Sequence, residues 1–112
     1  MNIKNIKTQM KKSILEFCIL SIIKDGEVYA SDIIDTLKHV KFFVVEGTIY
    51  PLLTRLKNTS LLHYRWKESS FGPPKKYFPL TTKGEAVLKE LNETWNELSE
   101  SVDQLRKKTH TS

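Results

Sequence analysis

The side chains of this sequence that are best suited to chemistry are cationic, and they concentrate between residues 47 and 80. The other segments sum to zero, with +4 for residues 1–12, −3 for residues 13–46 and −1 for residues 81–112. The formal net charge of +5 therefore comes from residues 47–80, where Glu68 opposes six cations: Arg55, Lys57, Arg65, Lys67, Lys75 and Lys76. Such a cluster is typical of proteins that bind nucleic acid, and an anionic membrane surface is the alternative.

Hydrogen-bonding groups follow one face of a predicted helix over residues 46–58. Its apolar face has the spacing i, i+3, i+4 and i+7, with Ile49, Leu52, Leu53 and Leu56. A solvated opposite face would more often carry Glu and Lys, whereas this one carries groups that suit a DNA groove: Thr48, Tyr50, Pro51, Thr54 and Arg55. We expect these five residues to recognise DNA, with Arg55 on a guanine or a phosphate. An ordinary polar surface is the alternative.

A β-hairpin is predicted directly after this helix. Leu62, Tyr64 and Trp66 alternate with His63, Arg65 and Lys67, which predicts a strand with one buried and one cationic face. Residues 75–80 predict the return strand, and we expect Gly72, Pro73 and Pro74 to lie in the loop outside the ladder. We expect phosphate contacts from Arg65, Lys67, Lys75 and Lys76, and a buried underside of the hairpin formed by Tyr64, Trp66 and Phe78.

Two further helices are predicted before this unit, over residues 9–24 and 30–39, from their apolar periodicity. The fold class is therefore mainly α with a small β-hairpin. Two helices joined by a short connection and followed by a hairpin form a winged helix-turn-helix, whose second helix enters the major groove. The 112 residues allow one structural domain, with a winged-helix region over residues 1–80 and a C-terminal helix over residues 81–112.

The last helix is predicted from a capping box at Thr82 and Glu85 to about residue 108. About 26 residues at 1.5 Å each reach roughly 39 Å, beyond the width of a domain of this size, so part of the helix should project. Six residues on it follow a heptad spacing, which predicts pairing with a second copy of the chain: Leu88, Leu91, Trp95, Leu98, Val102 and Leu105.

Catalysis is not indicated by this sequence. It shows no nucleophile beside a base, no glycine-rich phosphate loop and no paired carboxylates, and its three histidines lack metal-ligand spacing. We therefore expect neither an enzyme nor a metal or other cofactor. Cys18 is the only cysteine, and the apolar run of residues 14–23 is too short to cross a bilayer, so we expect a cytoplasmic protein without a membrane partner.

The stretches VVEGTIYPLLTRLKNTSLLHYRW and GPPKKYFPLTTKG resemble the PadR family of bacterial transcriptional regulators. The family's recognition-helix motif corresponds to Thr48, Ile49, Tyr50, Pro51, Arg55 and Leu56. Its hairpin motif corresponds to Gly72, Lys75, Lys76, Tyr77, Phe78, Leu80 and Thr81. Where many relatives have a Gly-Tyr pair, this chain has Val28 to Ser31, which departs from the pattern.

The resemblance implies a homodimeric repressor that pairs through its first and last helices, binds a double-stranded DNA operator and is released by a small aromatic effector. It also implies that Trp95 stacks on planar ligands, although packing between subunits is the more frequent role of an interfacial aromatic residue. The rival hypothesis is a winged-helix module that binds another protein without specific operator binding. A drug-binding sensor without operator affinity is a weaker third possibility.

Overall fold

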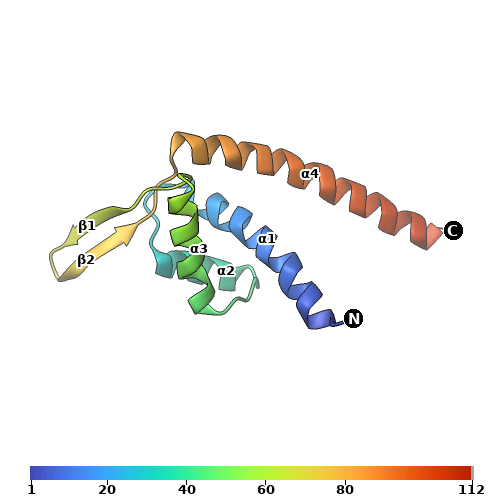
Figure 1. Ribbon diagram of the computed structural model, residues 1–112, viewed down its shortest axis with the longest axis horizontal. Coiled ribbons are helices and arrows are strands. Elements are labelled where there is room, and N and C mark those ends of the chain that lie inside the picture. The colour runs from blue at the N-terminus through green and yellow to red at the C-terminus, as the bar shows by residue number, and fades with distance from the viewer. Residues whose placement is uncertain (112) are drawn as a thin grey trace.

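The computed structural model describes the backbone of residues 1–111 and the side chains of residues 1–107. In this part of the chain, four helices and a small hairpin follow one another in the order α1 (Ile3–Ile23), α2 (Ala30–His39), α3 (Glu46–Asn58), β1 (Arg65–Ser69), β2 (Gly72–Tyr77) and α4 (Thr82–Thr111). This architecture confirms the predicted winged helix-turn-helix (Figure 1). The bounds of α2 and α3 agree with their prediction, whereas α1 begins six residues earlier because the Asn2 side chain accepts from the N–H groups of Lys4 and Asn5.

The core lies where α1, α2 and α3 meet, and α4 closes it at one end. The predicted apolar face of α3 is buried, as are side chains of α1, α2 and the hairpin's base. Fourteen side chains form this single cluster: Leu15, Ile19, Leu20, Ile23, Ile33, Ile34, Leu37, Ile49, Leu52, Leu53, Leu56, Leu62, Phe78 and Leu88. Because periodic apolar residues of every helix meet there, burial holds α3 with its opposite face outward.

The hairpin differs from its prediction in three respects. Its strands lie at Arg65–Ser69 and Gly72–Tyr77, not at residues 62–67 and 75–80, because the ladder continues to the turn at residues 70–71. Gly72, Pro73 and Pro74 lie inside β2, with Gly72 opposite Ser69 and Lys75 opposite Lys67. A two-stranded ladder tolerates proline because each strand has one free edge. Trp66 was expected in the buried underside, but it is 67% exposed, since the hairpin projects from the body and no element covers that part of β1 (Figure 1).

Helix α4 begins at a close contact with the loop that precedes the hairpin. Thr81, one residue before the predicted capping box, accepts from the N–H of Gly84 through its hydroxyl at 2.8 Å and donates to the Ser60 carbonyl at 2.6 Å. A Cβ on Gly84 would overlap the carbonyl oxygen of Leu61. Glycine is therefore required at this position for α4 to approach the body of the protein.

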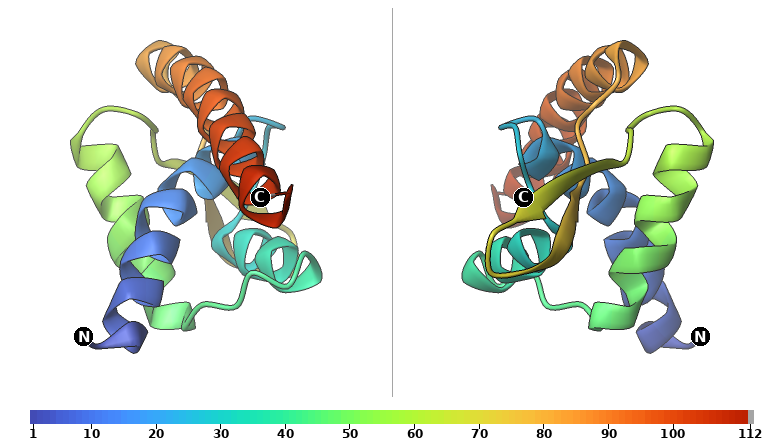
Figure 2. Two further views of the ribbon diagram at one scale, coloured as in Figure 1. Left: turned by 90° about the vertical axis from the view of Figure 1, so that its right-hand side faces the viewer. Right: turned by 90° about the vertical axis from the view of Figure 1, so that its left-hand side faces the viewer.

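Most of α4 extends away from that body. The molecule measures 63 × 30 × 24 Å, and α1 and α4 diverge toward their free ends (Figures 1 and 2). Leu88 is only 5% exposed and Leu91 packs against the same core, so these two members of the heptad pattern serve the chain's own fold. The remaining four are 43–65% exposed: Trp95, Leu98, Val102 and Leu105.

Candidate nucleic-acid interface

The exposed face of α3 lies between two cationic elements. The hairpin is on one side of α3 and the N-terminal half of α1 is on the other, and the N-terminal ends of α1 and α3 lie on the same side of the molecule (Figures 1 and 2). The first twelve residues hold four lysines and no acid. The cations therefore flank α3 on both sides, a distribution that the linear sequence does not show.

The five predicted recognition residues divide over three strips of α3. Tyr50 and Thr54 lie toward the hairpin, where the Thr54 hydroxyl is 3.3 Å from that of Tyr64. Thr48 and Arg55, seven positions apart, lie toward α1. Pro51 is exposed. The structure thus brings all five to the exposed surface of α3. Pro51 lies between the strip that faces the hairpin and the strip that faces α1, and both of these strips carry hydroxyl groups.

Arg55 has a partner that the sequence analysis did not identify. Its guanidinium Nη1 lies 3.1 Å from Oε1 of Glu16 in α1. The Arg55 side chain is 61% exposed, so the pair is at the surface and contributes at most about 1 kcal/mol to stability. Because the two residues come from different helices, no local pattern signals the contact.

The cations of the hairpin lie on its two faces. Residues directly opposite each other in an antiparallel ladder share a face, so Lys67 and Lys75 are neighbours, while Lys76 and Trp66 share the other face. The ammonium groups of Lys67 and Lys75 repel each other, because like charges directly opposite in a ladder are destabilising. An acid beside Lys67 offsets this repulsion.

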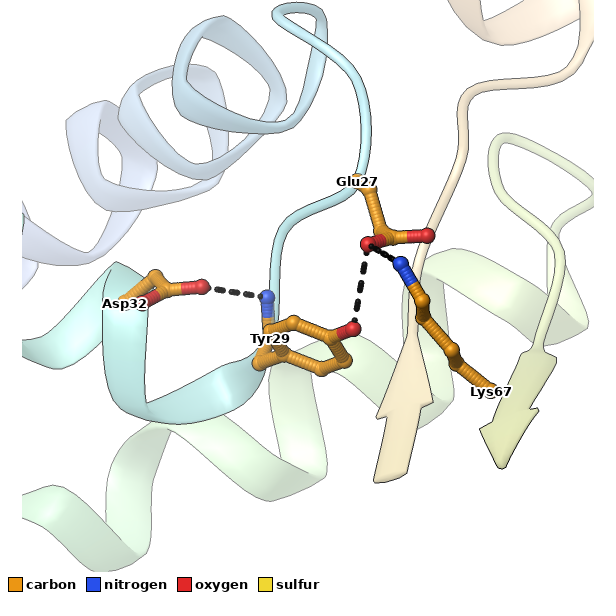
Figure 3. Close-up of polar contacts among 4 residues, drawn as sticks. All are labelled: Glu27, Tyr29, Asp32 and Lys67. Carbon is orange, nitrogen blue, oxygen red and sulfur yellow. Dashed lines mark hydrogen bonds and ion pairs between the residues drawn. The ribbon is translucent and has the colours of Figure 1, made fainter. Parts of the chain in front are cut away.

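That acid is Glu27, in the turn between α1 and α2 (Figure 3). Its Oε2 accepts from Lys67 Nζ at 2.9 Å and from the Tyr29 hydroxyl at 3.2 Å. The hydrogen bond from Lys67 lowers the pKa of Glu27, and the same bond raises the pKa of Lys67. Asp32 accepts from the Tyr29 N–H at 3.0 Å and so satisfies a donor at the start of α2. The hairpin is thereby tied to the helix-turn-helix.

Aromatic rings hold the other lysines of the hairpin. Lys76 Nζ is 4.0 Å from the ring centroid of Tyr64 and 5.5 Å from that of Trp66. Lys75 Nζ is 5.6 Å from the Tyr29 centroid. Cation–π contacts of this kind orient an ammonium group without neutralising its charge. Tyr29 and Tyr64 therefore position the hairpin's lysines, a role that sequence reasoning missed because it considered the charges alone.

The described part of the chain contains neither a cluster of metal-binding side chains nor a helix that could span a membrane. Residues 1–107 contain no group of three or more His, Cys, Asp or Glu side chains that could hold a metal ion. None of the described helices is long and apolar enough to cross a membrane. Cys18 is half-buried in α1, and burial raises the pKa of its thiol, which lowers its reactivity.

A helix-turn-helix with an exposed second helix, a cationic hairpin and a projecting last helix defines a winged-helix protein. Residues 19–90, more than half of the chain, match the family described as "Transcriptional regulator PadR-like family". The chain therefore belongs to the PadR-like family, whose members are transcriptional regulators and not enzymes. This result confirms the resemblance drawn from the recognition-helix and hairpin motifs.

Solved structures of similar proteins agree with this assignment. A PadR-like transcription factor from Bacteroides fragilis is 54% identical, with a TM-score of 0.75 over 90% of this chain and 98% of that one. A PadR-like regulator from Bacillus cereus is 43% identical, with a TM-score of 0.80 over 87% and 95% of the two chains. Bacillus subtilis PadR, solved with operator DNA, is 26% identical, with a TM-score of 0.63 over 70% of this chain and 46% of that one.

Proposed function

We propose that this protein is a homodimeric repressor that binds a double-stranded DNA operator through α3 and is released by a small aromatic effector. The observation that carries the proposal is the exposed face of α3, flanked by cations on both sides. Support also comes from Bacillus subtilis PadR, whose structure was solved in complex with operator DNA. In this proposal α3 enters the major groove through Thr48, Tyr50, Pro51, Thr54 and Arg55.

The cations on either side of α3 would contact the phosphates. Arg65, Lys67, Lys75 and Lys76 would bind the backbone beside the groove that α3 enters, and lysines of α1 would bind on the opposite side. The two sets of contacts would have different roles: phosphate contacts would set the position of α3, and the side chains of α3 would contact the base edges. Glu16 and Glu27 limit the charge of this surface in the unbound protein.

A second copy of the chain would cover the exposed apolar side chains of α4. Trp95, Leu98 and Val102 lie on the half of α4 that extends beyond the core, and Met10 of the diverging α1 is also exposed. An apolar stripe this long, left in solvent, is typical of an interface. A pair of copies joined along α1 and α4 would present two α3 helices to successive major grooves of one duplex, about 34 Å apart.

The effector would bind beside Trp95. The indole is 43% exposed, and its ring centroid lies 6.4 Å from that of Phe17, with 42° between the ring planes. Two such aromatic rings in the proposed interface offer stacking surfaces to a planar molecule. Because α1 also carries Glu16, a ligand that moves Phe17 would alter the contact between Glu16 and Arg55.

Salt-dependent DNA binding tests the proposed function. A labelled duplex, selected by the wild-type protein from a random pool, is titrated between about 50 and 200 mM salt, with a scrambled duplex in parallel. We expect a steep loss of affinity with salt, corresponding to roughly six or more phosphates, and a clear preference for the selected duplex.

Substitution of Lys75 and Lys76 by Gln should reduce the salt dependence, whereas Lys89→Gln, an exposed lysine of α4, should not. A protein-interaction module would show neither the salt dependence nor the sequence preference.

A further inference from the structure

The turn of the hairpin presents an aromatic side chain to solvent. Ser69 at the end of β1 is opposite Gly72 at the start of β2, so Ser70 and Phe71 form the turn. Phe71 is 100% exposed, and its N–H donates to the Ser69 hydroxyl at 3.3 Å. The register shifts between Lys67 and Ser69, which bends the strand immediately before the turn. The ring therefore lies at the outermost point of the hairpin.

The fold does not account for this ring. A phenylalanine left in water forgoes about 1.5–3 kcal/mol of burial. Single exposed apolar side chains are common, so exposure by itself indicates no partner. The surroundings of Phe71 do indicate one, because Trp66 of the same hairpin is also exposed and the paired lysines Lys67 and Lys75 precede and follow the turn. An apolar tip between cations complements a partner that has anionic groups on either side of flat apolar surfaces, as DNA has phosphates on either side of its stacked bases.

The hairpin also holds its tip in a fixed position relative to α3. The ion pair of Lys67 with Glu27 joins the hairpin to the turn before α2 (Figure 3). The hydroxyls of Thr54 and Tyr64 join its base to α3. Such contacts reduce the ordering cost of binding, because the tip is already in place when α3 meets its partner.

We propose that Phe71 enters the minor groove beside the major groove that α3 occupies and wedges between two base pairs. The inference rests on the proposed function and adds a contact to it. The minor groove is about 6 Å wide, which is too narrow for a hairpin whose strands lie about 4.8 Å apart before side chains are added. A single aromatic ring at the tip fits it, while Lys67 and Lys75 contact the phosphates along its edges.

The wedge gives the protein a preference at bases that α3 does not reach. Apolar wedges unstack one base step and kink the duplex by about 20–90°. Pyrimidine–purine steps such as TA and CA unstack most easily, so operators should carry such a step at the position of the hairpin tip. The preference comes from deformability of the duplex, and no hydrogen bond to a base is needed.

The test compares Phe71→Ala with Ser70→Ala, a matched change in the same turn that keeps the ring. Both proteins are titrated onto the duplex selected by the wild type, which carries a fluorophore at each end and a fluorescent adenine analogue at the proposed step. We expect Phe71→Ala to bind about 10-fold more weakly, to bend the duplex less and to lose the fluorescence change of the analogue. Its salt dependence should equal that of the wild type, because no charge is removed, and Ser70→Ala should behave as the wild type.

Two results would overturn the inference. The first is a Phe71→Ala protein that binds and bends the duplex as the wild type does. The second is a wild-type protein that sediments with anionic phospholipid vesicles and a Phe71→Ala protein that does not, although both bind DNA equally well. This result would assign the tip to a membrane surface. Failure of the wild type itself to bind any duplex would instead contradict the proposed function. Because the ring contributes nothing to the core, Phe71→Ala should unfold at the same temperature as the wild type.

Discussion

Arg55 of α3 and Glu16 of α1 are joined by an ion pair of 3.1 Å at the edge of the proposed DNA-binding face. The next residue of α1, Phe17, contacts Trp95 of α4 through its ring. One turn of α1 thus touches both the helix proposed to read DNA and the helix proposed to bind the effector. This arrangement provides a physical connection between the two sites, because a shift of α1 changes both contacts together.

The ion pair predicts that Glu16 weakens DNA binding in the wild type. Glu16→Gln should increase operator affinity a few-fold, because Arg55 no longer exchanges a carboxylate for DNA, while Arg55→Ala should decrease it. Anisotropy titrations of both single variants and the double variant measure the coupling. The two effects should not add, since Glu16 acts through Arg55. Strictly additive effects would show that Glu16 does not act through Arg55.

The pair of Glu27 and Lys67 predicts a pH dependence of stability. The pKa of Glu27 is lowered in the folded state, so its contribution is present at neutral pH and is lost as the pH falls through the acidic range. The pKa of Lys67 is raised, so its contribution is present at neutral pH and is lost only at strongly alkaline pH. Thermal unfolding should show Glu27→Gln slightly less stable than the wild type at pH 7, and the difference should diminish as the pH falls through the acidic range. An undiminished difference at low pH would contradict this account.

Gly84 predicts a large and local loss of stability. Gly84→Ala places a methyl group against the Leu61 carbonyl and should reduce the free energy of unfolding by about 1–3 kcal/mol. Gly47→Ala is the matched control, because nothing lies within 4 Å of a Cβ at that position in α3. The control should be stabilised by about 0.5–1 kcal/mol through helix propensity. Denaturant unfolding of the two variants measures both values, and equal responses would disprove the close approach of α4.

Trp95 predicts a fluorescence signal for effector binding. The chain has two tryptophans, so Trp66→Phe leaves Trp95 as the only indole. Titration of this variant with planar cations and phenolic acids should quench its emission at low ligand concentration, because a stacked ligand contacts the indole directly. Phe17→Ala should weaken the binding. Quenching no greater than that of free tryptophan would assign Trp95 to packing between subunits.

The sequence predicts the helices well and the polar contacts poorly. The apolar spacing of α3 was sufficient for its bounds and its buried face, because that face is selected by a single periodicity. The hairpin was less predictable, since a projecting ladder accommodates Pro73 and Pro74 and leaves Trp66 exposed, whereas the sequence pattern assumes a strand packed on a core.

The partners of the cations could not be predicted at all. Glu16 reaches Arg55, and Glu27 reaches Lys67, across elements that are distant in the sequence. Local charge patterns report on neighbours along one helix or strand, not on contacts that the tertiary fold creates. The sequence therefore gives the net charge of residues 47–80, whereas the position of each charge on the surface, and its partner, depend on the tertiary fold.

Footprinting of the selected duplex tests the central claim most directly. Two copies joined through α1 and α4 should protect two half-sites related by two-fold symmetry and centred about 10 base pairs, or a multiple of this, apart. Replacement of Leu98 and Val102 by Glu, at exposed positions of α4, should leave the fold intact and abolish the paired protection. Protection of a single asymmetric site by the wild type, or no protection in dilute buffer, would contradict the claim.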